Sequence, residues 1–130
     1  MLIEEGLITY LLAQSGVTAY VGEQIHFVHA PQNVTAPYII IIKISGVREH
    51  SHDGSSELAH PRFQLSVFAN TYSEVKGIAS ALQTVLQTYS GTMGSVNVDV
   101  VFYDNEVDMY EQETGLYHTA LDYIIWHTES

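Results

Sequence analysis

Two polar stretches of the sequence place imidazole and carboxylate groups close enough together to suggest metal chemistry. The first runs from Glu49 through His50, Ser51 and His52 to Asp53. Imidazole nitrogens and carboxylate oxygens can hold zinc, but a specific zinc site fixes its ligands on rigid elements with supporting hydrogen bonds. This run lies in a Gly/Ser-rich segment, so we interpret it as a solvated loop. His60, which follows nearby, does not change that interpretation.

The second stretch is acidic and begins like a calcium-binding loop. Asp104, Glu106 and Asp108 alternate as the first ligands of such a loop would. Met109 then stands where the loop requires a glycine, and Gly115 stands where it requires a bidentate glutamate. We therefore interpret this stretch as a solvated acidic loop, and we expect no metal site and no cofactor.

Hydrolytic catalysis would need a carboxylate beside a histidine, and Asp104 or Asp122 could be paired with His118. A chain with seven histidines and fifteen acids offers such pairs by composition alone, and no nucleophile elbow accompanies them. His118 and His127 fall in or beside a predicted strand, where a structural role is the default. We predict no catalytic residues and no enzymatic activity.

The composition narrows the function further. Hydrophobic residues make up 46% of the 130 residues, which is typical of a globular chain, and we predict one domain over residues 1–130. No apolar run is long enough to span a membrane, so we expect no membrane partner. Four Lys and Arg against fifteen Asp and Glu give a net charge of −11. A surface that binds nucleic acid needs clustered Lys and Arg, and the four here are scattered, so we expect no specific DNA binding. Such a chain would still be compatible with the wall of a passage through which DNA slides without being bound.

A strand followed directly by a helix organises the rest of the chain. Phe63, Leu65 and Val67 alternate with polar residues, which indicates a half-buried strand. Thr71 and Glu74 then match a capping box, which predicts a helix start. The residues after them form one apolar stripe at helical spacing: Val75, Ile78, Ala79, Leu82, Val85 and Leu86.

The other elements follow from similar patterns. A second amphipathic helix is predicted within residues 1–14, with a short helical turn or loop over residues 17–23. Further strands are predicted at residues 24–28, 38–45, 96–102 and 116–126, with the second buried on both faces. Together they predict an α+β fold, a mainly antiparallel sheet of about four strands with two helices packed on one face.

We expect the interaction surfaces of the protein to lie in two long loops, because long loops between well-defined strands are often functional. They span residues 46–60 and 103–115. The residues that we expect to make interactions within them are Arg48, Glu49, His50, His52, Asp53, Asp104, Glu106, Asp108, Tyr110 and Glu111.

A series of short motifs runs along nearly the whole chain. The motifs are Ala30-Pro31-Gln32, Pro37-Tyr38-Ile39, Ser45-Gly46, Arg62-x-Gln64-x-x-Val67, Thr71-Tyr72-x-Glu74-x-x-x-Ile78-Ala79, Tyr110-Glu111, Gly115-Leu116-Tyr117 and Leu121-Asp122-Tyr123. None of them is diagnostic alone, but in their order and spacing the chain resembles the tail-completion or tail-terminator family of long-tailed bacteriophages and gene transfer particles. One departure is His118, where relatives often carry a basic residue.

The resemblance implies a structural role in virion assembly. Such proteins cap the head-proximal end of the tail tube as a ring, commonly a hexamer, end tube growth and join the tail to the head. The implied partners are other copies of the chain, the major tail tube protein and a head-completion or connector protein, with DNA passing through the lumen unbound. The implied location is the virion tail, assembled in the cytoplasm of a bacterial host. A head-side connector or adaptor is the alternative, and a metal-dependent enzyme using the His and acidic stretches is the third.

Overall fold

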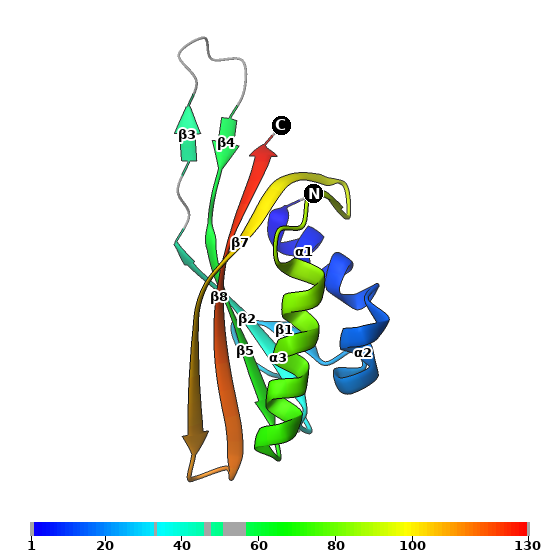
Figure 1. Cartoon of the computed structure of the whole chain (residues 1–130), viewed down its shortest axis with the longest axis vertical. Helices are drawn as coiled ribbons and strands as arrows, with labels where there is room; N and C mark the ends of the chain where they lie inside the picture. Colours follow the sequence, from blue (N-terminus) through cyan, green and yellow to red (C-terminus); the bar gives the residue numbers. More distant parts are fainter. Residues whose placement is uncertain (1, 33, 46–47, 51–56, 130) are drawn as a thin grey trace.

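A computed structural model describes residues 2–32, 34–45, 48–50 and 57–129. Within these residues there are three helices and eight strands (Figure 1). The helices are α1 (Ile3–Leu12), α2 (Ser15–Val21) and α3 (Tyr72–Leu86). The strands are β1 (Ile25–Phe27), β2 (Tyr38–Ser45), β3 (Arg48–His50), β4 (Glu57–Ala59), β5 (Arg62–Ala69), β6 (Gly91–Met93), β7 (Val96–Glu111) and β8 (Leu116–Glu129). None of the helices in the described part is long and apolar enough to cross a membrane.

All eight strands belong to one twisted, mixed sheet. The β3–β4 pair continues the β2–β5 pair, because β4 and β5 follow one another along the same edge of β8. The sheet is therefore six strands wide, in the order β1, β2, β5, β8, β7, β6. Only β1 and β2 pair in parallel among the pairs described; the others are antiparallel.

The three helices lie on one side of this sheet (Figure 1). The predicted α+β class, the mainly antiparallel pairing and the helices on one face are confirmed, whereas the predicted number of strands and helices was too small. The additional helix, α2, occupies the segment predicted as a short helical turn or loop, and it buries Val17 and Val21. Its seven residues are too few to show a clear helical period in the sequence.

The predicted strand and helix after residue 60 are confirmed as β5 and α3. Phe63, Leu65 and Val67 are fully buried, and the side-chain oxygen of Thr71 accepts a hydrogen bond from the Glu74 amide at 3.1 Å. The Glu74 carboxylate reaches back to the amide of Asn70 at 3.4 Å, one residue earlier than an ideal capping box requires.

The strand predicted over residues 38–45 is confirmed as β2, but it is buried on both faces only in its first half. Ile39 and Ile41 are fully buried beneath the helices, and Ile40 is buried on the opposite face. Lys43 and Ile44 are exposed, because the sheet is covered less completely toward this end of the strand.

Neither of the two long loops has the predicted form. Residues 48–50 and 57–59 of the first form the paired strands β3 and β4, and residues 51–56 lie outside the described residues. In the second, β7 continues to Glu111, so that only residues 112–115 form a turn. The prediction of a loop over residues 103–115 was wrong because acidic side chains of β7 form ion pairs with Arg62 of β5 and Lys76 of α3. These carboxylates therefore do not need a solvated loop.

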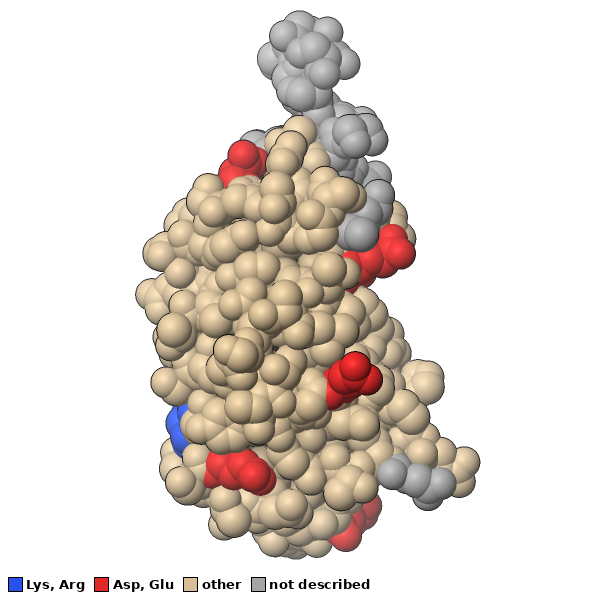
Figure 2. All heavy atoms as spheres, turned by 90° about the vertical axis from the view of Figure 1, so that its right-hand side faces the viewer, with Lys and Arg blue, Asp and Glu red and all other residues tan. Residues whose placement is uncertain are grey.

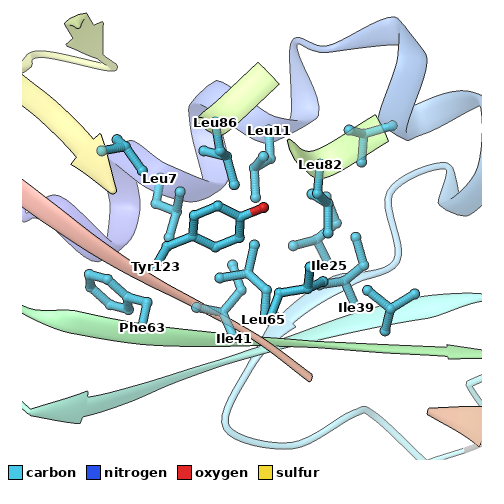
Figure 3. Packing of buried hydrophobic residues seen from close by; sticks show 14 of the residues in the cluster. Leu7, Leu11, Ile25, Ile39, Ile41, Phe63, Leu65, Leu82, Leu86 and Tyr123 are labelled. Carbon is cyan, nitrogen blue, oxygen red and sulfur yellow. The ribbon is translucent and has the colours of Figure 1, made fainter. Parts of the chain in front are cut away.

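A single apolar core fills the space between the sheet and the helices (Figure 3). Tyr123 of β8 points from the sheet toward Leu11 of α1 and toward Leu82 and Leu86 of α3. All four side chains are fully buried. The core therefore joins the first helix, the third helix and the central strand, and it holds β7 and β8 in place relative to α3.

Candidate interaction surface

The structure separates the residues predicted to make interactions into two groups. Asp104, Glu106, Asp108, Tyr110 and Glu111 lie along the second half of β7. Arg48, Glu49 and His50 form β3, and His52 and Asp53 lie outside the described residues.

One side of β7 faces α3 and carries an ion cluster. Glu106 and Asp108 lie opposite Leu121 and Thr119 of β8, whose side chains point into the core. The Lys76 ammonium of α3 lies 3.1 Å from the Asp108 carboxylate and also contacts Glu106. Asp108 further accepts hydrogen bonds from the Thr119 hydroxyl at 2.9 Å and the Tyr72 hydroxyl at 3.1 Å. These contacts fix α3 to the acidic half of β7.

The cluster shifts the pKa values of Lys76 and Asp108 in the direction that favours their charged forms. Hydrogen bonding to Glu106 is the main cause of the raised pKa of Lys76. Partial burial acts to raise the pKa of Asp108, but hydrogen bonds from Lys76, Thr119 and Tyr72 outweigh it and lower that pKa. At neutral pH the cluster thus holds two carboxylates and one ammonium, and it keeps an excess negative charge.

The opposite side of the sheet carries a second ion cluster. A β-bulge between Tyr103 and Asn105 inserts Asp104 into β7. The carboxylate of Asp104 lies 2.5 Å from one terminal nitrogen of the Arg62 guanidinium, and Asp122 of β8 lies 3.2 Å from the other. The hydrogen bond to Asp104 is the main cause of the raised pKa of Arg62.

This second cluster overturns the catalytic pairing considered from the sequence. Asp104 and Asp122 bind Arg62, while the His118 ring stacks on Phe68 with the ring centroids 4.2 Å apart. Burial lowers the pKa of His118, which favours the neutral imidazole. No group of three or more His, Asp or Glu side chains in the described part of the chain could hold a metal ion.

An aromatic row crosses the face of the sheet that the helices leave uncovered. Tyr38, Phe68 and His118 come from β2, β5 and β8, and each ring stacks on the next. No pattern in the sequence predicted this row, although the three residues occupy paired positions of neighbouring strands. Only the register, which no local pattern reveals, brings them together.

Near this row, the second half of β7 exposes apolar surface. Val107 exposes 45% and Met109 42% of its residue surface to solvent. On the helix-bearing side, by contrast, Figure 2 shows scattered acidic residues and almost no basic ones. That distribution agrees with the scattered positions of the four Lys and Arg in the sequence, and the described residues on this side form no cluster of cations that could bind phosphates.

A family model described as tail completion protein gp17 matches residues 5–128. The chain belongs to this family. The resemblance inferred from the sequence is therefore confirmed, and with it a structural, non-enzymatic role as a tail completion protein.

A solved structure also shares the fold of this family member. It is a chain in the virion of a native gene transfer agent particle, with a TM-score of 0.70 at 13% sequence identity. The match covers 90% of this chain and 87% of the other. None of the curated proteins matches the sequence significantly.

Proposed function

We propose that this tail completion protein caps the head-proximal end of the tail tube as a ring, ends tube growth and joins the tail to the head. The observation that carries the proposal is the family match over residues 5–128. The chain acts as one domain over residues 1–130, within the virion tail, after assembly in the bacterial cytoplasm. Six copies are the number that the family resemblance favours.

The surfaces described above suit such a role. The second half of β7 combines exposed apolar side chains with carboxylates that internal cations partly neutralise. A protein with a net charge of −11 can associate with itself only where its charges are absent or compensated. We therefore place the interaction residues of this region, Asp104 to Glu111, at contacts with other subunits or with the tail tube.

The remaining acidic surface would suit the wall of a DNA passage. Because the described surface has few free cations, DNA phosphates would be repelled and not held. A ring whose lumen is neutral or basic in an assembled particle would contradict this part of the proposal.

The choice between a tail cap and a head-side connector rests on which partner binds. Purified protein with an affinity tag should retain assembled tail tubes in a pull-down and should block further tube growth when added to polymerising tube protein. The matched arm uses purified heads that lack tails. Retention of heads without any retention of tubes would identify a head-side connector and contradict the proposed cap.

A further inference from the structure

The second half of β7 has an open backbone edge. β6 pairs with β7 only over Val96–Val98, and the turn before β6 pairs with Val101, whose amide donates to Tyr89 and whose carbonyl accepts from Thr88. Beyond Val101, the described residues supply no backbone partner to this edge as far as Glu111. A free strand edge of this length is an available template for another strand.

The register shows which backbone groups face outward along this edge. Backbone N–H and C=O groups of alternate residues point to the same side of a strand. The backbone N–H and C=O of Val101 point away from β8, and the bulge at Asp104 shifts the alternation of backbone groups by one residue. Tyr103, Glu106, Asp108 and Tyr110 therefore present their N–H and C=O groups away from β8.

At the opposite side of the sheet, the outer edge of β2 is also open beyond the short part that pairs with β1. β1 covers β2 as far as Ile41, whose carbonyl accepts from the Val28 amide at 2.9 Å. Lys43 is the next residue whose backbone points outward, and no described residue pairs with it there. Ile44 lies in a bulge beside it, with 49% of its residue surface exposed.

The two open edges complement one another in charge. Glu106 and Asp108 point to the helix side of the sheet, and Lys76 neutralises only one of their two charges. Lys43 lies on the same side of the sheet, opposite the buried Phe63, and its side chain is 41% exposed. Its internal contact with Glu4, at 3.7 Å, is long. A sheet continued from β7 of one copy into β2 of another would place Lys43 beside the excess negative charge.

We propose that the open edge of β7 pairs with the open edge of β2 in a second copy of this chain. Main-chain hydrogen bonds would supply the attraction, and the charges would set which edge meets which. Since two different edges meet, the contact is heterologous and each copy can bind a further copy on both sides. The inference rests on the proposed ring, for which it names the contact that links neighbouring subunits.

Cysteine cross-linking tests the pairing on a clean background, because the chain contains no cysteine. Ile44→Cys and Val107→Cys are made as separate proteins, mixed, and treated with a short bis-maleimide. The mixture should give a cross-linked dimer, whereas each variant alone should give none, because a heterologous contact never brings two identical edges together. Ser80→Cys on the exposed face of α3, mixed with Val107→Cys, is the matched control and should stay uncross-linked.

A backbone variant tests the same contact without a reagent. The Tyr110 amide faces away from β8, so Tyr110→Pro should leave the internal sheet intact and remove one hydrogen bond of the proposed contact. Because either substitution removes the ring that packs on Tyr117, we expect the thermal midpoint of Tyr110→Pro to match that of Tyr110→Thr. We expect Tyr110→Pro to lose the oligomer in native mass spectrometry. Tyr110→Thr, which keeps the amide, should still form the oligomer. A Tyr110→Pro protein that assembles as the wild type does would overturn the pairing.

The outcomes separate this inference from the proposed ring. An oligomer that forms without the link between residues 44 and 107 overturns the edge pairing and leaves the ring standing. If the protein is monomeric at every concentration, and if copies bound to tail tubes also do not associate with one another, both the ring and the edge pairing are contradicted.

Discussion

The Asp108 carboxylate of β7 lies 3.1 Å from the Lys76 ammonium of α3, which ties the longest helix to the acidic half of the strand. Lys76 also contacts Glu106, so its removal would leave two carboxylates together without a cation. We predict that Lys76→Met lowers the free energy of unfolding by about 1 kcal/mol, a value kept small because the groups are partly exposed.

The matched control for that variant is Lys43→Met. Lys43 is more exposed and its contact with Glu4 is long, so this change should have little effect on monomer stability. Urea unfolding of both variants at low protein concentration measures the difference. Equal losses in the two proteins would show that the cluster around Lys76 does not fix α3 to β7.

The Asp108 cluster also predicts a dependence of stability on pH. The pKa of Asp108 in the folded chain lies below its ordinary value of 3.8, so the carboxylate stabilises the fold above that value. This contribution is lost as the pH falls through the lowered pKa. The difference in unfolding free energy between the wild type and Asp108→Asn should therefore be largest near neutral pH and should shrink below about pH 4. A difference that stays constant down to pH 2 would contradict the assignment.

The buried hydroxyl of Tyr123 predicts a stabilising substitution. Within the described part of the chain this oxygen has no hydrogen-bond partner, and the surrounding side chains are apolar (Figure 3). Burial raises the pKa of Tyr123, in agreement with that environment. Because an unsatisfied buried hydroxyl is costly, Tyr123→Phe should raise the free energy of unfolding by about 1 kcal/mol.

Tyr103 provides the control for this substitution. Its hydroxyl donates a hydrogen bond to Glu106 at 3.0 Å, so Tyr103→Phe should lower stability by about 1 kcal/mol. The two variants remove the same atom from neighbouring rings and should shift the urea midpoint in opposite directions. A loss of stability in both would mean that the Tyr123 hydroxyl is satisfied.

His118 predicts a second pH effect, at higher pH than that of Asp108. Burial lowers its pKa in the folded chain, so the unfolded chain takes up a proton more readily. The contribution of neutral His118 to stability is present above its ordinary pKa of 6.5 and is lost as the pH falls through the folded value. We compare the wild type with His118→Phe, whose ring can still stack on Phe68. When the pH falls from 7.5 to 5.5, the free energy of unfolding should decrease less for His118→Phe than for the wild type. An identical loss in both proteins, measured by urea unfolding, would contradict this.

The elements that could be predicted from the sequence are those whose signal is local. The alternation around Leu65 and the cap at Thr71 depend on neighbours within a few residues, and both gave β5 and α3 correctly. The acidic half of β7 could not be recognised in this way. Its carboxylates are compensated by Arg62 and Lys76, which stand about 30 or more residues away in the chain.

The residues expected to make interactions were predicted to lie together in solvated loops, but the structure divides the acidic ones. Asp104 binds Arg62 on one side of the sheet, whereas Glu106 and Asp108 contact Lys76 on the other. Their part in binding other proteins stays a prediction. The aromatic row through Phe68 and the open edge of β7 depend on which strands become neighbours, and strand order is a property of the whole sheet. Ser45 of β2 and Arg62 of β5 are an example. They pair in the sheet, but no pattern in the residues between them predicts which positions of the two strands lie opposite each other.

The central claim is that this tail completion protein ends tail growth and joins the tail to the head. Electron microscopy of particles made without the protein tests it most directly, with particles from a complemented strain as the control. We expect tails of variable and excessive length, detached from full heads, and restoration of uniform attached tails on complementation. Tails of normal length joined to heads in the absence of the protein would contradict the claim.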